Sequence, residues 1–517
     1  MKRRVKKKFY RICNRIFLTV ILILLQVGWL VVSLFRLTEY SAAISAVFAL
    51  ISALMVLYVI SKDLNPEFKI GWIILILLLP VFGGLFYFCF GDKKPSKFLR
   101  KKMKSFHDEF RKDIIVDEIA LEEFRRQDHR AAMTADYIRN TSDYPVYPNY
   151  CTEYFELGEV MFQRMCEELE QAKHFIFLEY FIMNEGKMWD TILEILVRKS
   201  EQGVEVRIMY DDIGCVALLP PGYQEFIENM GSKIQCVAFN PLVPFLSFVM
   251  NNRDHRKIMV IDGHTAFNGG INLSDEYINI GSQYGHWKDT GVMVKGPAVW
   301  NFTVMFMEAW RAYKPDDTDI NNYRPHLEEL PVFDRTDGFV QPFCDTPLED
   351  EPIAENVYIE LINQAVDYVY IFTPYMVIDN EMKTALCLAA KRGVDVRMVT
   401  PGIADKKIVN RLTKSNYPPL LKAGVRIYEY TPGFIHAKSY VCDDKFGVVG
   451  TINMDFRSLY LHFECGTFLY NTKAVQKLKQ DCQDTFQVSK EIYLSDTRQG
   501  YFGGLFDSLL RMIAPLL

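Results

Sequence analysis

Apolar residues form three long runs within the first 90 positions of the chain. They cover residues 16–35, 41–60 and 71–90, and each is close to the length that crosses the apolar core of a bilayer. Pro80 interrupts the third run, which is therefore the least regular. The first run lacks a small-residue cleavage site, so the pattern predicts an anchor rather than a cleaved signal peptide. Residues 1–92 are expected to hold two to three membrane-spanning segments.

Basic residues flank this apolar region on both sides. One cluster lies at residues 2–15 and the other at 93–104. Basic residues favour the cytosolic side of a membrane, yet three complete spans would put the two clusters on opposite sides. Either the third run is re-entrant or interfacial, or one run does not span. The stretch 93–145 is highly charged and mostly helical in pattern, which indicates a linker.

Beyond residue 145 the pattern changes to strands alternating with a helix, and it occurs twice. The expected elements are strands at 175–182 and 204–210 around a helix at 188–202, and again strands at 368–374 and 394–400 around a helix at 380–392. Residues 203–207 align with residues 393–397, which indicates an internal duplication. The sequence therefore predicts an α/β fold with two pseudo-symmetric halves, at 146–325 and 326–490.

Two further apolar stretches bear on contact with lipid. Residues 239–250 are too proline-rich for a regular helix and unusually apolar for a loop, so they are expected to touch lipid tails or to pack in the core. The C-terminal segment 491–517 carries apolar residues at near-helical spacing from Gly504 onward. An amphipathic segment of this kind packs on a domain or lies on a membrane surface.

The composition narrows the class of protein. The net charge is −5 and half of the residues are hydrophobic, which fits a globular protein with membrane segments and does not favour a nucleic-acid binder. The eleven cysteines are dispersed and form no CxxC pairs, so neither a zinc site nor a disulfide framework is expected.

A histidine–lysine–aspartate pattern of eight residues occurs once in each half. The two copies are His255, Lys257 and Asp262, and His436, Lys438 and Asp443. The chain has only nine histidines in 517 residues, so the number of matches expected by chance is roughly a few hundredths per chain. At the same distance after each copy a small-residue turn ends in an asparagine, Asn272 or Asn453. Two copies extended in the same way indicate a shared function.

The spacing within each copy has a chemical consequence. Side chains alternate along a strand, so each histidine points to the same face as its lysine. Two histidines, two lysines and two asparagines around one site would hold a phosphate diester, because lysine and asparagine donors stabilise charge on its oxygens. One histidine can then attack phosphorus while the other protonates the leaving alcohol, so neither a metal nor a cofactor is expected.

Four carboxylates are candidates to orient the imidazoles or to neutralise the lysines. Asp262 and Asp443 lie inside the motifs, and Asp289 and Glu464 follow them further along the chain. The sequence alone does not separate these roles.

The paired pattern is similar to the HKD motif of the phospholipase D superfamily. More closely, the segments 252–257, 287–291 and 453–458, together with the N-terminal apolar runs, resemble bacterial cardiolipin synthases over residues 40–517. The resemblance implies two phospholipase D-like halves that share one active site. It also implies that the second and third apolar runs form a membrane hairpin.

The resemblance implies a reaction as well. In that family two phosphatidylglycerol molecules, one the donor and one the acceptor, give cardiolipin and glycerol. His255 would form a phosphatidyl-histidine, and His436 would protonate the departing glycerol and then deprotonate the incoming hydroxyl; the reverse assignment stays open. The superfamily often has serine after the glycine of the turn, where this chain has Gly270 and Thr451. A symmetrical hydroxyl contact to phosphate is therefore in question.

The resemblance implies a multi-pass protein of the bacterial cell membrane, with the catalytic region on the cytoplasmic side and with homo-oligomers left open. A phospholipase D that uses water, or another phosphatidyltransferase such as a phosphatidylserine synthase, would use the same residues and stays open. An HKD nuclease is disfavoured by the acidic balance and the anchors. A catalytically silent scaffold is disfavoured because both motifs are intact.

Overall fold

The fold is described from a computed structural model. The described residues are 28, 39–79, 83–87, 91, 97–110, 114, 116–241, 252–315, 319–331, 337–349, 351–497 and 501–516. The chain divides into two compact units. The larger unit consists of residues 95–241 and 252–503, and the smaller one contains the helices before residue 95 and the residues from 504 onward. Both copies of the histidine–lysine–aspartate motif belong to the larger unit.

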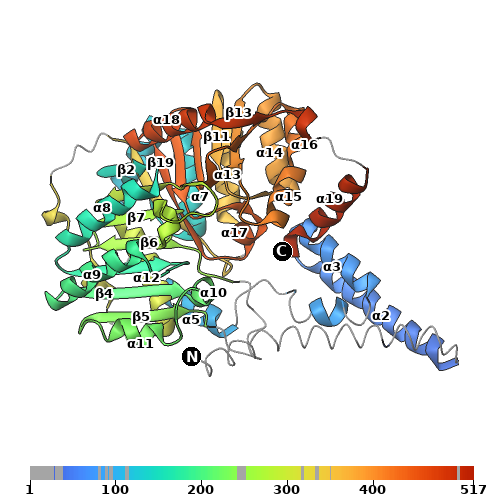
Figure 1. Ribbon diagram of the computed structural model, residues 1–517, viewed down its shortest axis with the longest axis horizontal. Helices are drawn as coiled ribbons and strands as arrows, with labels where there is room; N and C mark the ends of the chain where they lie inside the picture. Colours follow the sequence, from blue (N-terminus) through green and yellow to red (C-terminus); the bar gives the residue numbers. More distant parts are fainter. Residues whose placement is uncertain are drawn as a thin grey trace. The chain divides into compact units, whose positions relative to one another are not determined.

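The first half of the larger unit is built on a seven-stranded sheet (Figure 1). Its strands are, in spatial order, β2 (Cys151–Phe155), β9 (Gly291–Lys295), β7 (Thr265–Gly269), β6 (Lys257–Ile261), β3 (Phe175–Tyr180), β4 (Glu205–Asp211) and β5 (Ile234–Phe239). The strands β3, β4 and β5 are parallel, and the remaining pairs are antiparallel. The helices α8 (Gly158–Gln171) and α9 (Lys187–Glu201) pack their apolar side chains on one face.

The second half repeats this arrangement strand for strand. The equivalent order is β10 (Phe339–Asp345), β19 (Glu464–Tyr470), β17 (Phe446–Gly450), β16 (Ser439–Cys442), β11 (Tyr368–Phe372), β13 (Asp395–Pro401) and β14 (Arg426–Tyr430). Short strands at both edges, β1 (Tyr147–Pro148) and β20 (Ser489–Ile492), widen this sheet to nine strands. The helices α13 (Ile353–Gln364) and α14 (Asn380–Lys391) cover its outer face. The shared strand order confirms the predicted duplication of an α/β unit.

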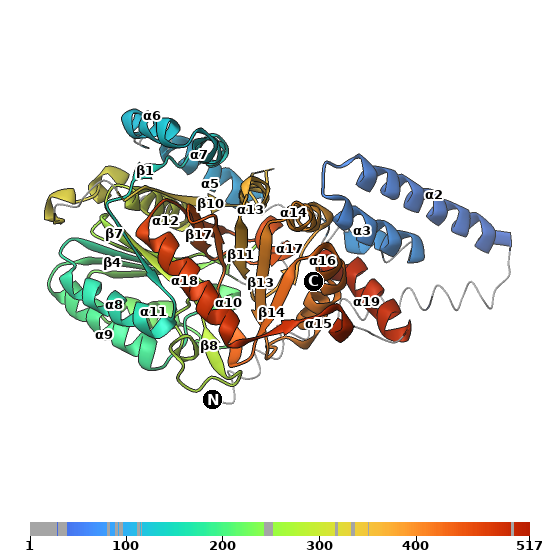
Figure 2. The same ribbon diagram turned by 90° about the horizontal axis from the view of Figure 1, so that it is seen from above.

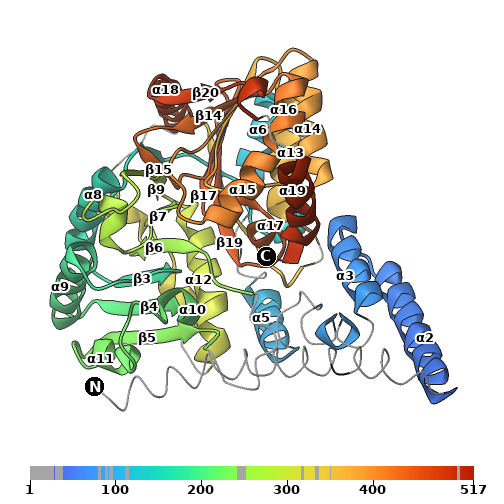
Figure 3. The ribbon, with the colours of Figure 1, turned by 45° about the vertical axis from the view of Figure 1, so that its right-hand side comes forward.

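The two sheets contact each other directly where β7 and β9 meet β17 and β19. The same apolar layer contains helices α12 (Val299–Tyr313) and α18 (Lys473–Gln487), which Figures 2 and 3 show between the halves. Helix α12 is apolar on almost every face, which is the pattern of a helix surrounded by protein. Its side chains Phe306 and Trp310 are fully buried, and Phe306 stacks on Phe177 of β3. This shared layer joins the two halves into one unit.

The elements predicted for each half are confirmed at nearly the predicted positions. In the first half they are β3, α9 and β4, and in the second half they are β11, α14 and β13. The aligned segments both begin with a glycine in the left-handed region, Gly203 at φ 97° and Gly393 at φ 100°. Each ends a helix and turns the chain into the next parallel strand, where a side chain would be strained. The sequence similarity of these segments therefore reflects a repeated helix-to-strand turn.

The stretch predicted as a charged linker is helical, as expected, and it packs on the larger unit. It forms α5 (Lys97–Phe110), α6 (Glu118–Gln127) and α7 (His129–Ser142). Helix α5 packs beside α12, and α6 buries Phe124 against Phe339 of β10. The expected boundary at residue 146 also falls just before β1, which pairs with β10 of the second half. The segment before residue 146 is therefore part of the folded unit and not a free connection.

The smaller unit contains a helical hairpin. Helix α2 (Glu39–Ser61) covers the second apolar run, and α3 (Pro66–Leu78) covers part of the third. Asn65 caps α3 by accepting a hydrogen bond from the backbone N–H of Glu67 at 3.0 Å, and Pro66 follows at the first helical position. Residues 16–35 lie outside the described residues, apart from Gly28. Within the described ranges, no helix has both the length and the apolarity needed to cross a membrane.

Of the two stretches expected to touch lipid, only the second is described. Residues 242–250 lie outside the described residues, while Phe239, which precedes them, ends β5 in the core. The predicted C-terminal segment contains α19 (Tyr501–Ile513) and begins inside β20, which belongs to the larger unit. In α19, Leu510 is buried while Leu505, Phe506 and Leu509 are exposed, so the expected amphipathic helix is present and one apolar face is uncovered.

Candidate active site

Each motif histidine lies immediately before a central strand of its own sheet. His255 lies two residues before β6, of which Lys257 is the first residue, and His436 lies three residues before β16, which begins just after Lys438. In each copy the lysine Nζ donates a hydrogen bond to the carbonyl of its histidine, at 2.6 Å from Lys257 to His255. The histidine side chains are about nine-tenths buried. The segment that leads into each strand therefore places the imidazole beside the ammonium group.

Each imidazole is held by a carboxylate from the other half of the protein. The Nδ1 atom of His255 lies 2.8 and 3.0 Å from the two carboxylate oxygens of Glu464. The Nδ1 atom of His436 lies 2.6 Å from Oδ2 of Asp289. A carboxylate at Nδ1 fixes the ring and leaves Nε2 as the nitrogen that is available for chemistry.

Backbone pairing between the halves produces these crossed contacts. The strand β15 (Gly433–Ile435), which leads into His436, pairs in parallel with β8 (His286–Lys288), which leads into Asp289. The residue before His255 forms a parallel bridge with Phe463, the residue before Glu464. The backbone N–H of His255 donates to the carbonyl of Phe463 at 2.9 Å. Each of these two backbone pairings ends just before a histidine on one segment and a carboxylate residue on the other. Each histidine therefore faces the carboxylate of the segment with which its own segment pairs.

Asp262 and Asp443 do not contact the imidazoles, which corrects one of the two roles left open for them. The carboxylate of Asp262 accepts hydrogen bonds from the backbone N–H groups of residues 173–175 at 2.8 to 2.9 Å. Asp443 accepts equivalent bonds from residues 366–368 at 2.7 to 2.9 Å. Both residues have a positive φ of 50°, which aspartate tolerates at a turn. Each motif aspartate therefore joins the turn after its own strand, β6 or β16, to the start of the adjacent strand, β3 or β11.

The two motif asparagines are buried at equivalent places. Asn272 donates from Nδ2 to the hydroxyl of Tyr277 at 2.7 Å, and Asn453 donates to the hydroxyl of Ser458 at 3.1 Å. Asn272 also accepts from the N–H of Ile182, whereas Oδ1 of Asn453 has no hydrogen-bond partner among the described residues. Their contact with phosphate stays a prediction.

The different residues at the two turns match the different lengths of the two carboxylates. A Cβ atom on Gly270 would lie 2.1 Å from Oδ1 of Asp289, so any side chain there would displace that carboxylate. In the second half Thr451 donates its hydroxyl to the longer Glu464. The hydroxyl at this position therefore supports a carboxylate, and the site does not hold two equivalent hydroxyls facing the phosphate.

Burial strongly changes the acid–base properties of the site. Burial and the nearby Lys438 lower the pKa of His436 to about 4. Burial lowers the pKa of Lys257 to about 8 and that of Lys438 to about 7. Burial and Lys257 lower the pKa of His255 well below its ordinary value. Both imidazoles are therefore neutral at neutral pH, as a nucleophile or a base must be.

The two carboxylates respond differently to the same burial. Burial would raise the pKa of Asp289, but the charge of Lys438 and the hydrogen bond with His436 hold it below its ordinary value. Burial raises the pKa of Glu464 well above its ordinary value. Asp289 is therefore the stronger stabiliser of a positive charge on its histidine, and the two pairs are chemically unequal.

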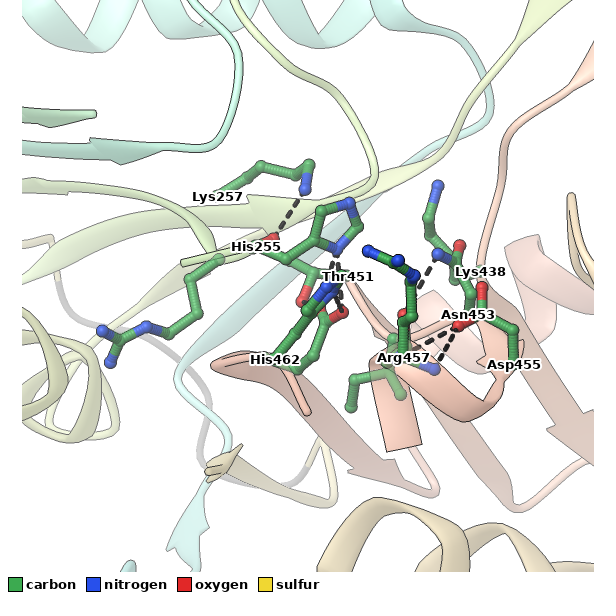
Figure 4. Close-up of polar contacts among 12 residues, drawn as sticks. His255, Lys257, Lys438, Thr451, Asn453, Asp455, Arg457 and His462 are labelled. Carbon is green, nitrogen blue, oxygen red and sulfur yellow. Dashed lines mark hydrogen bonds and ion pairs between the residues drawn. The ribbon is translucent and has the colours of Figure 1, made fainter. Parts of the chain in front are cut away.

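A third histidine, His462, was missed by the sequence analysis. Its ring centroid lies 5.6 Å from that of His255, and Figure 4 shows it beside His255, with Lys438 and Asn453 of the second half nearby. It belongs to no repeated motif, and its one sequence signal is that it stands two residues before Glu464. Only the folded chain brings it to His255.

The charge around these residues favours an anion. In the described part of the chain, His255, His462 and Glu464 each offer a ligand atom within 4.8 Å of the others, close enough to share a metal ion. The neighbouring cations Lys257 and Arg457, however, contribute to lowering the pKa of His462, and they would repel a metal cation. The same positive groups would attract the negatively charged oxygens of a phosphate diester.

Comparisons with known proteins agree with this geometry. A family model described as "Cardiolipin synthase, PLD-like domain" matches residues 165–306 and 358–485, one segment in each half. A second model, "Phospholipase_D-nuclease N-terminal", matches residues 44–91. The chain is 42% identical to an uncharacterized protein of Streptococcus mutans over 89% of this chain and 99% of that one. It is 33% identical to a cardiolipin synthase of Geobacillus kaustophilus over 90% of this chain and 92% of that one.

One solved structure has the same fold over most of the chain. A phosphatidylserine synthase of Haemophilus influenzae superposes with a TM-score of 0.56 at 15% sequence identity. The match covers 74% of this chain and 99% of that one. At this identity the likeness concerns the fold, which is a mixed α/β phospholipase D-like fold with two repeated halves.

Proposed function

Since the chain belongs to the cardiolipin synthase family of phospholipase D-like proteins, we propose that it transfers a phosphatidyl group between two phosphatidylglycerol molecules. The products are cardiolipin and glycerol. The observation that carries the proposal is the pair of buried histidines, each held at Nδ1 by a carboxylate of the other half and each beside a lysine. Two such pairs supply a nucleophile and an acid for one phosphate diester.

The reaction proceeds in two displacements at phosphorus. In the first, Nε2 of His255 forms a bond to phosphorus, the bond to the glycerol oxygen breaks, and His436 gives that oxygen a proton. In the second, His436 takes the proton of a hydroxyl on the acceptor lipid, whose oxygen forms a bond to phosphorus while the bond to His255 breaks. Lys257 and Lys438 stabilise the negative charge on the non-bridging oxygens during both steps.

The unequal carboxylates support this division of roles. The acid must carry a positive charge before it gives up its proton, and Asp289 stabilises that charge on His436. The negative charge of the bound diester also favours the protonated form of His436. The nucleophile must be neutral, and burial and Lys257 keep His255 neutral.

A membrane location fits the smaller unit. Many large apolar side chains of its hairpin are exposed: Val47, Leu50, Ile51, Leu54, Leu57, Tyr58, Ile60, Ile70, Leu77 and Leu78. Such a surface is larger than a monomer leaves to water, and it fits an apolar environment such as lipid tails. We propose a multi-pass anchor in the bacterial cell membrane. The basic clusters that flank it favour the cytoplasmic side for the catalytic unit.

The test uses the full-length protein in detergent–lipid micelles with phosphatidylglycerol as the sole substrate. Cardiolipin is measured by mass spectrometry and glycerol by a coupled enzymatic assay. Equal amounts of the two products support transfer between two lipids. Phosphatidic acid and glycerol without cardiolipin would show that water is the acceptor. No turnover of phosphatidylglycerol would refute the proposed donor.

A further inference from the structure

Two equivalent loops of the larger unit lie at the edge of the sheets where the active site is built. The strand β6 is antiparallel to β3, so Lys257 at its start pairs with Tyr180 at the end of β3. The parallel strands β3, β4 and β5 therefore end at the same edge as His255. In the second half β16 is likewise antiparallel to β11, so β11, β13 and β14 end beside His436. The loops that follow β4 and β13 consequently flank the site.

The first of these loops, residues 216–222, is apolar and exposed. It follows the short helix α10 (Asp212–Cys215) and contains no charged residue. Val216 is 41% exposed and Leu218 is 38% exposed. The helix α10 lies close to the site, because a Cβ atom on Gly214 would be 3.0 Å from the ring of Phe181, whose centroid is 4.9 Å from that of His255. An exposed apolar loop therefore borders the active site in the first half.

The second loop, residues 402–408, also exposes large apolar side chains. Ile403 is 42% exposed and Ile408, in the first turn of α15 (Lys407–Ser415), is 59% exposed. The backbone N–H of Ile403 donates to the carbonyl of Gly433 at 3.2 Å, in the strand β15 that leads into His436. The apolar side chains of this loop therefore border the active site in the second half.

The second loop carries positive charge as well. Lys406 and Lys407 are exposed, whereas the acidic Asp405 accepts a hydrogen bond from the hydroxyl of Tyr375. The Nζ atom of Lys406 lies 4.9 Å from the centroid of the Tyr375 ring. Burial lowers the pKa of His462, and Lys406 is one of the cations that add to this effect. The charge of this loop therefore acts within the active site.

The chemistry of the two loops fits a bilayer with anionic headgroups. Single exposed apolar side chains are common on protein surfaces. Here four of them occupy equivalent loops of the two halves, and both loops border a site whose proposed substrate is an anionic lipid. An apolar side chain gains free energy by entering the boundary between headgroups and acyl chains, and a lysine beside it is attracted to lipid phosphates.

We propose that the loops 216–222 and 402–408 dock the active site on an anionic bilayer, where Leu218 and Ile408 enter the headgroup boundary and Lys406 and Lys407 bind lipid phosphates. This inference rests on the proposed function and adds a contact of the larger unit to that of the exposed helices of the smaller unit. Docking brings the phosphodiester to His255 while the acyl chains stay in the membrane and out of water.

The first test detects contact with lipid directly and needs no turnover. Leu218→Trp and Ile408→Trp are made in the full-length protein, which is reconstituted in vesicles of phosphatidylglycerol and a phosphatidylcholine brominated near the start of its acyl chains. Bromine quenches a tryptophan that lies among the lipids, so the emission added by each new tryptophan should fall relative to unbrominated vesicles. In vesicles without phosphatidylglycerol the quenching should be weaker, because the two lysines lose their anionic partners.

The matched control places a tryptophan at the opposite edge of the second sheet. Val366 is 71% exposed and lies two residues before the start of β11, whereas the active site lies where β11 ends. The emission added by Val366→Trp should be the same in brominated and unbrominated vesicles.

The second test separates docking from chemistry by comparing two forms of the substrate. Glycerol release is measured with long-chain phosphatidylglycerol in the vesicle and with dihexanoyl phosphatidylglycerol dissolved below its critical micelle concentration. In the double variant Leu218→Ser and Ile408→Ser, kcat/KM for the vesicle lipid should fall about tenfold, because two apolar side chains no longer enter the bilayer. The value for the dissolved lipid should change by less than about threefold. Val366→Ser should leave both values unchanged, and melting temperatures show that each protein is folded.

Three results would overturn the inference. Absence of quenching at both loop positions would show that the loops do not enter the bilayer, and this result stands even if the serine variants do not fold. An added emission that shifts with protein concentration instead of lipid would assign the surface to a second copy of the chain. Equal losses on the vesicle and dissolved lipids would show that the loops support the reactive centre. Failure of the proposed function is distinguishable, because the unaltered protein would then form no cardiolipin while the quenching measurement still reports the contact.

Discussion

At the scale of single residues, the two motif histidines look alike in the sequence and differ in their surroundings. His436 has an ionised Asp289 as its partner, whereas Glu464, the partner of His255, has a raised pKa. The two turns also differ, because Gly270 leaves room for Asp289, whereas Thr451 donates a hydrogen bond to Glu464. These differences fit the proposed roles of His255 as the nucleophile and His436 as the acid.

This division predicts that two alanine variants respond differently to the leaving group. His255→Ala and His436→Ala should each lower turnover of phosphatidylglycerol by at least about 10³-fold. With phosphatidyl-p-nitrophenol, whose leaving group departs without a proton, His436→Ala should still release p-nitrophenolate. It should also accumulate a phosphatidyl-histidine on His255, which rapid denaturation at neutral pH followed by mass spectrometry detects. Accumulation of the adduct on His436 in the His255→Ala protein would show that the roles are reversed.

At the scale of elements, the charged segment before residue 146 shows how a polar helix joins the core. His107 of α5 lies 2.7 Å from Oε1 of Glu308 on α12 and 3.0 Å from Oδ2 of Asp143 after α7. Burial acts to lower its pKa, but the two carboxylates raise it to about 10. One protonated histidine therefore joins α5 and α7, whose sequence pattern predicts only a linker, to α12 of the first half.

His107 predicts a pH-dependent stability. Its folded pKa lies above the unfolded value near 6.5, so its contribution is complete below that pH and is lost as the pH rises through about 10. His107→Gln should lower the free energy of unfolding by about 1.5–3 kcal/mol at pH 6, and the difference should shrink towards pH 10. Denaturant unfolding at several pH values measures both quantities. A difference that does not vary with pH would contradict the charged pair.

At the scale of the whole molecule, the residues of the proposed mechanism and the exposed apolar helices belong to separate units. The larger unit has its own apolar core between two sheets, and it contains every residue of the proposed mechanism. The exposed apolar side chains of α2 and α3 belong to the smaller unit. The two halves of the larger unit, by contrast, depend on each other, because each contributes the carboxylate that the other half's histidine needs.

This separation predicts the behaviour of a shortened chain. A protein of residues 95–503 should fold and process a short-chain, water-soluble phosphatidylglycerol with kcat within about threefold of the full chain. Its binding to vesicles, measured by co-sedimentation, should fall by at least about tenfold. Unchanged vesicle binding would show that the larger unit carries the membrane contact. The full-length protein in the same detergent is the control.

The sequence by itself determined the repeated α/β halves and the motif histidines, lysines and asparagines. Periodicity and spacing report local structure, and a duplicated motif at equal spacing is visible without a fold. Only the tertiary structure decided which carboxylates serve the imidazoles, because that choice depends on two backbone ladders between segments far apart in the chain. For the same reason the sequence did not separate Asp262 and Asp443, which tie turns to strands, from Asp289 and Glu464. His462 was invisible for a related reason: its significance comes from lying next to His255, more than 200 residues away in the chain.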